Sequence, residues 1–346
     1  MIYGSVRMDT TSASCFQCHH AIIDGVYLGL LFADFFEFLD LIQRRLLCVH
    51  DVKESSLWPA IENLVPKATA GKIRRIERVI CTGVSSSIEN SCDALEAYEH
   101  CFHSEISLLS NERKQTSTNR FRVPTFESSR IITECKEKRS TVTGAAIAAA
   151  CRAFGLLLQP YLPDDVQVLN VPIEVMVNLR RYVANENIFE SYPGVAAIHV
   201  PITVRIPVKE NLLSQDVFWY LARQCSDELR NIIASYEPIR QLSKETKEEI
   251  NAPKKSGKSK YVICLTNLSN IDGVVKSEQS ERFTLTEFPG CTNLAMDDMP
   301  IFYIGMYSMR GELHFDIGHC AGYTSSHTAS SFCRELVRCL SLKSKL

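Results

Sequence analysis

The sequence predicts a mixed α/β protein whose strands are concentrated in the second half of the chain. Helical patterns, amphipathic or Ala-rich, recur along the sequence, and apolar β-branched runs typical of buried strands follow residue 160. The chain has 346 residues, which is long enough for two domains. Its 45% hydrophobic and 23% charged residues are typical of a folded globular protein rather than a disordered one.

The first 50 residues predict a short strand over 14–18 and then a helix over 26–47, in which apolar side chains recur at helical spacing. The most apolar run, 25–33, is followed by acidic residues and is shorter than the roughly 18–20 residues that cross a bilayer, so we expect no membrane span. The predicted apolar face of the helix consists of Leu28, Leu31, Phe32, Phe35, Phe38, Leu39 and Ile42.

Residues 52–135 are less regular. A strand is predicted over 76–82, and the polar segment 111–119 predicts a loop or a crossover connection. We place a boundary close to residue 125. It separates a partial N-terminal lobe, residues 1–125, from a C-terminal lobe, residues 126–346.

The second half has clearer start and stop signals. Thr141 opens an Ala-rich helix that Pro160 and Pro163 stop, and Arg310-Gly311 predicts the turn of a hairpin. The predicted elements are helices over 141–158, 213–236 and 325–340, strands over 166–179, 194–204 and 261–268, and a hairpin over 301–318.

Charge and cysteine usage narrow the function classes. Lys plus Arg is 38 and Asp plus Glu is 40, a net charge of -2 that gives no support to a nucleic-acid partner. The 14 cysteines are scattered and no signal-peptide pattern opens the sequence, so we expect a reducing, cytoplasmic location. Glycine-rich nucleotide motifs and the G-x-S-x-G hydrolase elbow do not occur.

One motif has the residue types of a catalytic site: residues 19–25 fit the pattern H-H-x-x-x-D-G. The imidazole of His20, at the end of a predicted strand, can accept a proton near neutral pH. Asp24 can hold the local loop through an ion pair or backbone hydrogen bonds, or cap the following helix. Gly25 permits a backbone conformation that a Cβ would obstruct.

The same region suggests two alternative interpretations, a haem attachment site and a zinc site. Cys15 to His19 matches the C-x-x-C-H pattern of haem attachment, and Cys15, Cys18, His19 and His20 have the chemistry of zinc ligands. Four neighbouring ligands on one extended strand point to opposite faces, which opposes tetrahedral closure around one ion. We therefore expect no metal site and no haem.

The motif resembles the signature of the CoA-dependent acyltransferase superfamily. This superfamily includes chloramphenicol acetyltransferase, nonribosomal peptide condensation domains and alcohol acetyltransferases. The order of later features is also similar to the family's. These features are Thr141–Ala145 before the Ala-rich helix, Val177–Arg180 with its N-L-R ending, Phe218–Ala222 in a long helix, and Thr266–Ser269, which is similar to a family strand ending in S-N-L-G.

The resemblance implies two chloramphenicol-acetyltransferase-like lobes, each a sheet covered by helices, with a tunnel between them. It implies acyl transfer from an acyl-CoA or acyl-carrier thioester to a small alcohol or amine, with acyl-CoA as co-substrate and no bound cofactor. His20 would then be the general base. His19, Asp24 and Gly25 would be structural, and Arg180 would pair with Asp24.

Several roles stay open at this point. Arg181 is a rival to Arg180 as the partner of Asp24. Asn267 and Ser269 are candidates for lining the channel or for donating to the oxyanion. The basic segment 254–260 is either a solvated loop or an attractor of CoA phosphates.

The position of the motif suggests a second hypothesis. In the resembled families a long stretch precedes the histidines, whereas here the motif begins at His19. We therefore expect a truncated first lobe and an exposed apolar patch beside His20. The alternative to an acyltransferase is a non-catalytic, truncated acyltransferase-like protein that acts in binding.

Overall fold

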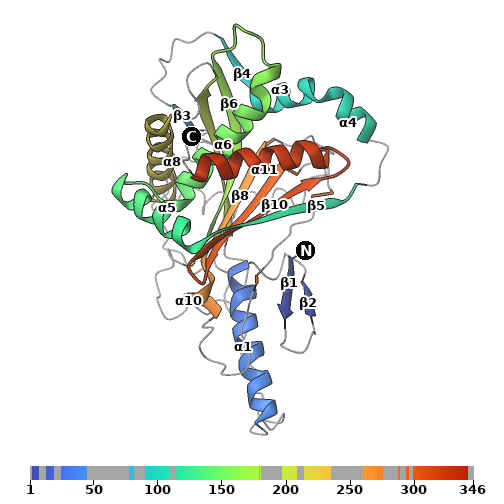
Figure 1. Cartoon of the computed structure of the whole chain (residues 1–346), viewed down its shortest axis with the longest axis vertical. Helices are drawn as coiled ribbons and strands as arrows, with labels where there is room; N and C mark the ends of the chain where they lie inside the picture. The colour runs from blue at the N-terminus through green and yellow to red at the C-terminus, as the bar shows by residue number, and fades with distance from the viewer. Residues whose placement is uncertain are drawn as a thin grey trace, which may run out of the picture.

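In the computed structural model, a mixed eight-stranded sheet organises the part of the chain that the structure describes (Figure 1). The described residues are 2–7, 13–18, 25–44, 78–81, 90–109, 114–178, 180, 197–208, 214–234, 260–275, 287–288, 294–295 and 299–341. The sheet consists of β3 (Arg78–Cys81), β4 (Ser91–Asp93), β5 (Thr116–Val123), β6 (Val168–Asn178), β7 (Ala197–Pro207), β8 (Ile263–Asn270), β9 (Phe302–Met309) and β10 (Glu312–Cys320).

The strand order is β3-β7-β6-β8-β9-β10-β5, and β4 pairs with β6 beside this path. β8 is parallel to both of its neighbours, β6 and β9. β6 and β7 are antiparallel along their whole length, and β9 and β10 form a hairpin. Arg310 and Gly311 turn this hairpin with φ angles of 52° and 75°, the left-handed pair that a tight two-residue turn requires.

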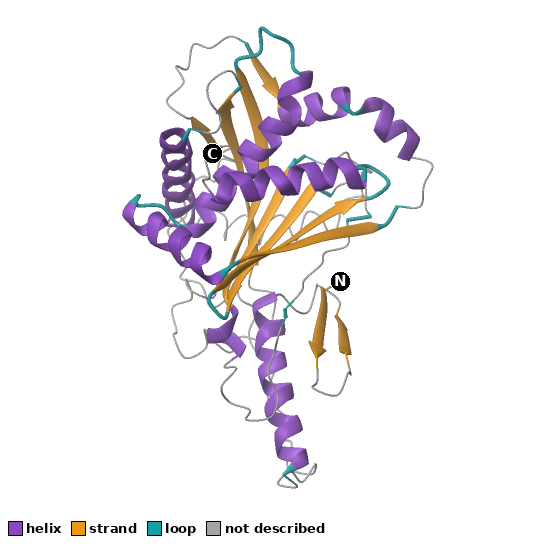
Figure 2. Ribbon diagram, in the orientation of Figure 1, coloured by secondary structure: helices purple, strands orange, loops and turns teal. Residues whose placement is uncertain are grey.

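Helices cover one face of the sheet (Figure 2). α6 lies at the centre of this layer and packs against both α8 and α11. Alternate residues of β6, such as Val171, Ile173 and Val175, are buried in the same core as these helices. The helices of the chain are α1 (Gly25–Gln43), α3 (Ala94–Cys101), α4 (His103–Leu109), α5 (Thr125–Glu137), α6 (Val142–Leu158), α8 (Gln215–Ala234), α10 (Ile271–Val275) and α11 (Ser326–Ser341), with a 3-10 turn at Gln159–Tyr161.

α6 is buried on nearly all sides because its small side chains allow close packing. Residues 145–151 are each at most 1% exposed, and alanine predominates among them. Within the described residues, Val142–Tyr161 is the segment long and apolar enough to cross a bilayer. However, 72% of its most apolar stretch is buried inside the protein, as expected of a core helix.

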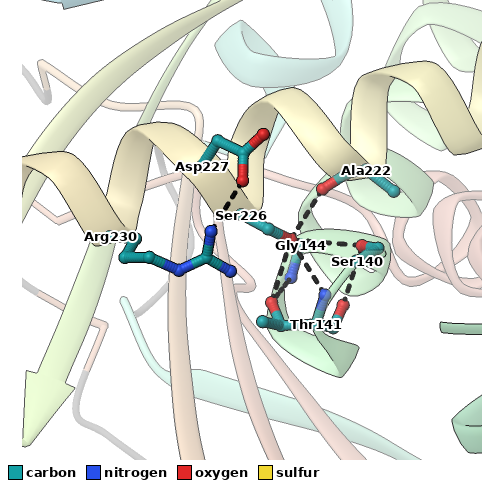
Figure 3. Close-up of polar contacts among 7 residues, drawn as sticks. All are labelled: Ser140, Thr141, Gly144, Ala222, Ser226, Asp227 and Arg230. Atoms are coloured by element: carbon teal, nitrogen blue, oxygen red, sulfur yellow. Dashed lines mark hydrogen bonds and ion pairs between the residues drawn. The ribbon is translucent and has the colours of Figure 1, made fainter. Parts of the chain in front are cut away.

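α6 and α8 approach each other closely at Gly144. The Ser226 hydroxyl donates to the carbonyl of Ala222, 2.8 Å away, and accepts from the backbone N–H of Thr141 at 2.9 Å (Figure 3). A Cβ on Gly144 would collide with the Ser226 hydroxyl and with the Ala222 carbonyl. A glycine is therefore required at this crossing.

A separate apolar cluster packs α1 against the ends of β8 and β9. Leu28, Phe32 and Phe36 of α1 are buried with Ile271, which opens α10, and with Tyr307 and Met309 of β9. The ring of Phe32 meets Phe288 edge to face, with centroids 5.8 Å apart. The first half of α1 is thus fixed against the end of β8, while its second half extends away from the sheet (Figure 1).

The structure confirms most predicted elements and corrects others. The predicted apolar face of α1 is wrong at Phe38 and Ile42, which are 40% and 46% exposed because the second half of α1 extends beyond the cluster. The predicted loop over 111–119 is wrong from residue 116, where edge strand β5 begins. The prediction missed β4, α3, α4, α5 and the isolated hairpin of β1 (Ile2–Arg7) and β2 (Ala13–Cys18), although the 14–18 strand itself is confirmed.

The lobe boundary near residue 125 stays a prediction. Three strands on its N-terminal side, β3, β4 and β5, are hydrogen-bonded into the same sheet as the later strands. The predicted end of the first helix at residue 47 lies outside the described residues.

Gly144→Ala should lower the free energy of unfolding by about 1–3 kcal/mol, because overpacking at a helix crossing forces the helices apart. Adding Ser226→Ala to the Gly144→Ala variant should restore only part of this loss, since the Ala222 carbonyl still blocks the new methyl group. Gly273→Ala is the control, because a Cβ there meets no atom within 4 Å. Urea denaturation of the three variants measures the effect, and equal stability of the two glycine variants would contradict it.

Folding stability should fall as the pH drops below about 6.5, because burial lowers the pKa of His319 and His314. The unfolded chain then binds protons that the folded chain resists, so stability is complete above the unfolded pKa and declines below it. Neither ring nitrogen of His319 has a hydrogen-bond partner within the described part of the chain. His319→Leu should therefore weaken the acid sensitivity without lowering stability at pH 7. Thermal unfolding at several pH values checks this.

Candidate active site

The predicted site residues fall into two groups. His19, His20 and Asp24 lie outside the described residues, so their roles stay predictions. Gly25 is the first residue of α1. The candidate side chains that the structure describes are those of Arg180, Asn267 and Ser269.

Arg180 is one of the most buried charged residues, at 2% exposure. Asn178 ends β6, and its side-chain oxygen accepts from the backbone N–H of Arg180 at 3.0 Å and from Nη1 at 3.4 Å. The Asn178 side chain thus bonds to both the backbone and the guanidinium of Arg180, and so fixes the position of both. A buried guanidinium is tolerated only where hydrogen bonds and opposite charge offset its desolvation. The rival residue, Arg181, lies outside the described residues.

The side-chain amide of Asn267 is fixed at both ends. Its Nδ2 donates to the hydroxyl of Thr143 at 2.9 Å, and its Oδ1 accepts from the backbone N–H of Ser269 at 2.8 Å. One amide hydrogen of Asn267 is therefore committed to Thr143, and the N–H of Ser269 is committed to Asn267. The donor that these two bonds leave for an oxyanion is the second amide hydrogen of Asn267.

Ser269 adopts a left-handed conformation with φ 66°, inside a register shift of β8 between Asn267 and Asn270. Glycine adopts such a conformation most readily, and the family pattern that this strand resembles places glycine at the corresponding position. Here the hydrogen bond from Ser269 to Asn267 holds the serine in it. The same kink directs the chain from β8 into α10.

Topology brings Arg180 and Asn267 to one edge of the sheet. β6 and β8 are parallel neighbours, with Met176 aligned to Thr266. Asn267 lies one residue beyond the last β6–β8 pair, and Arg180 lies two residues beyond the end of β6, so both are toward the same end of adjacent parallel strands. Such edges are where ligand sites form in parallel sheets, because the loops that leave them converge.

The start of α1 lies at this edge as well. Leu28 is 1% exposed and belongs to the cluster that contains Ile271, with Leu268 packed against it. Leu268 lies between Asn267 and Ser269 in the sequence. Gly25, the last residue of the histidine motif, is within one helical turn of Leu28.

Sequence analysis missed two residues of this site. Thr143 was noted only as part of a helix start, and Asn178 only as part of the N-L-R pattern. The threonine hydrogen-bonds across 124 positions of sequence, which no local pattern reveals. Asn178 gave a usable signal, because asparagine two residues before an arginine at a strand end favours a side-chain-to-backbone turn.

The comparison with known proteins rests on solved structures, because no protein-family model and no curated protein matches the chain. The epimerization domain of tyrocidine synthetase B aligns at 14% identity over 93% of this chain and 66% of its own, with a TM-score of 0.53. Trichothecene 15-O-acetyltransferase from Fusarium sporotrichioides gives 12% identity, 92% and 64% coverage, and a TM-score of 0.56.

A third similar structure is the condensation domain of the monacolin K polyketide synthase, at 10% identity, 93% and 67% coverage and a TM-score of 0.52. The chain has the condensation-domain and acyltransferase fold. Identities this low establish the fold alone, and they confirm the predicted mixed α/β class. The chain spans just under two thirds of the length of the first two of these structures.

Asp24 and Arg180 should behave as a coupled pair. Removing one partner of a buried ion pair leaves an uncompensated charge, so Arg180→Gln should cost about 3–5 kcal/mol of stability. In a double-mutant cycle with Asp24→Asn, the coupling energy should be about 0.5–3 kcal/mol. A cycle of Asp24→Asn with Arg181→Gln is the control. Additive effects in the first cycle and coupling in the second would assign the partner to Arg181 instead.

Proposed function

We propose that this chain transfers an acyl group from a CoA or carrier-protein thioester to the hydroxyl or amine of a small acceptor, with His20 as the general base. The observation that carries the proposal is the convergence at one sheet edge. The first turn of α1, which begins at the last residue of the histidine motif, packs through Leu28 in the cluster that contains Ile271 and Leu268. Asn267 and Ser269 belong to the same chain segment.

The fold supports the reaction class. Trichothecene 15-O-acetyltransferase, by its name, transfers acetyl groups, and this chain shares its architecture. The sequence motif and the shared architecture together support acyl transfer as the reaction class. The assignment of the individual residues rests on the motif and on the placement of Gly25.

The proposed chemistry follows from the residue types. The neutral imidazole of His20 takes the proton of the acceptor as its oxygen or nitrogen attacks the thioester carbonyl. The tetrahedral intermediate places negative charge on the former carbonyl oxygen. The second amide hydrogen of Asn267 is the proposed donor to that charge, and Ser269 beside it is proposed to line the channel. The carbon–sulfur bond then breaks, and the imidazolium returns its proton to the leaving thiolate.

Each supporting residue has a proposed positioning role. Asn267 is fixed by Thr143, so its remaining donor points in one direction without reorganisation. Arg180, buried at the end of β6, would hold Asp24 and through it the loop that carries His20. Acyl-CoA is a co-substrate in this proposal, and the chemistry needs no resident cofactor.

His20→Ala should reduce acyl transfer at least about 100-fold while the protein stays folded, since general-base help is typically worth 10²–10⁴. Release of free thiol from a panel of acyl-CoA donors, with alcohols and amines as acceptors, measures the rate. His103→Ala, which removes an exposed imidazole on α4, is the matched control.

Two outcomes would count against this assignment. A variant that keeps more than about a tenth of the wild-type rate would show that His20 is not the base. A folded wild-type chain that releases no thiol above background with any donor and acceptor would favour the non-catalytic binding role instead.

A further inference from the structure

A cavity of about 610 Å³ lies between α8 and the turn that joins α5 to α6. It is distinct from the sheet edge described above, and the predicted site does not use its residues. The lining side chains are Arg139, Ser140, Tyr220, Arg223, Gln224, Asp227 and Arg230. Three guanidinium groups thus face one cavity together with a single carboxylate.

The carboxylate does not neutralise the cavity. Asp227 pairs with Arg230 at 2.8 Å on the exposed surface of α8 (Figure 3). Among the described residues, Arg139 and Arg223 have no carboxylate partner. The cavity wall therefore carries two positive charges in excess, in a chain whose net charge is -2.

The backbone presents Arg139 in an unusual way. α5 ends in a Schellman motif, in which the N–H of Ser140 donates to the carbonyl of Cys135 and the N–H of Arg139 donates to that of Lys136. The residue at the position of Arg139 must be left-handed, and its φ is 55°. Glycine is the usual residue at such a position. An arginine there has a less favourable backbone conformation, but it places a guanidinium in the cavity wall.

The cavity is also held in a fixed shape. The Ser226 hydroxyl bonds to the hydroxyls of Ser140 and Thr141 at 3.1 and 3.0 Å and accepts the Thr141 N–H (Figure 3). Ser226 is 3% exposed, and Gly144 lets the two helices meet there. The turn that carries Arg139 is therefore fixed to the helix that carries Arg223.

We propose that this cavity is a binding site for a phosphate-bearing anion. Guanidinium groups recognise phosphate through paired, charge-assisted hydrogen bonds, and the hydroxyl of Tyr220 adds a neutral donor. The volume is large enough for a nucleotide-sized ligand. Two sources have this chemistry: the nucleotide end of a CoA donor, which rests on the proposed function, and a free phosphorylated metabolite, which does not.

Calorimetric titration of the full chain with inorganic pyrophosphate tests the site at physiological salt. Arg223→Gln and Arg139→Gly should each weaken binding about tenfold, the effect expected for loss of one charged hydrogen-bond donor. Arg139→Gly also relaxes the left-handed position, so it should lose affinity without losing stability. Asp227→Asn should tighten binding several-fold, because it removes the competing carboxylate.

Lys138→Gln is the matched control, since Lys138 lies in the same turn but does not line the cavity. No saturable binding up to the millimolar range would overturn the proposal. So would an equal loss of affinity in Lys138→Gln and Arg223→Gln, because that result means diffuse attraction rather than a built site.

Competition distinguishes the two sources. Displacement of pyrophosphate by CoA but not by pantetheine supports the nucleotide end of the donor as the ligand. Binding of pyrophosphate that CoA does not displace supports a free phosphorylated metabolite at the same site. Neither measurement needs turnover, so failure of the proposed acyl transfer leaves the result interpretable.

Discussion

The arrangement of the candidate site depends on the kink at the end of β8. The kink consists of three features: the fixed amide of Asn267, the left-handed Ser269, and the start of α10 at Ile271. The bond from Asn267 to Thr143 connects this kink to the first turn of α6. Asp272 of α10 then accepts the backbone N–H of Arg310 at 2.7 Å, which joins the kink to the β9–β10 turn.

The kink also determines where α1 can pack. A straight continuation of β8 would carry Ile271 along the sheet, whereas the turn places it against Leu28 and Phe32. Burial of three large side chains of α1 in that cluster contributes several kcal/mol, at about 25 cal/mol per Å² of apolar surface. The start of α1 is thereby held beside the segment that joins β8 to α10. Apolar packing is thus what holds α1, whose first residue is Gly25, in this position.

The fold was predictable from sequence wherever one strong period dominates. α8 and α11 alternate buried and exposed residues over many turns, and β6 and β7 have long β-branched runs. The region from 90 to 137 lacked such a signal because its elements are short or weakly apolar. α3 has eight residues, and β5 has intermediate or exposed side chains along most of its length as an edge strand. Its Arg120 pairs with Asp316 of β10 at 3.1 Å, a long-range contact that no local sequence pattern reveals.

The site was predictable to a different extent. Arg180, Asn267 and Ser269 were named from short patterns, and the structure brings them to neighbouring strand ends. Their partners could not be named, because Thr143 becomes a neighbour of Asn267 only when α6 packs on the sheet. The exposure of Phe38 and Ile42 shows the converse limit. Helical periodicity indicates which residues share a face, but not how far along the helix that face is covered.

The N-terminal turn of α6 links the sheet edge to the arginine-lined cavity. Its cap, Thr141, contacts Ser226 beside the cavity, and Thr143, two residues later, contacts Asn267 at the sheet edge. Successive residues of a helix point in different directions, so one turn can reach both places. An anion held by Arg139 and Arg223 would therefore lie one helical turn from the residue that orients Asn267. Because α6 is rigidly buried, the distance between the two places is fixed by the fold, and a ligand that reaches both must match it.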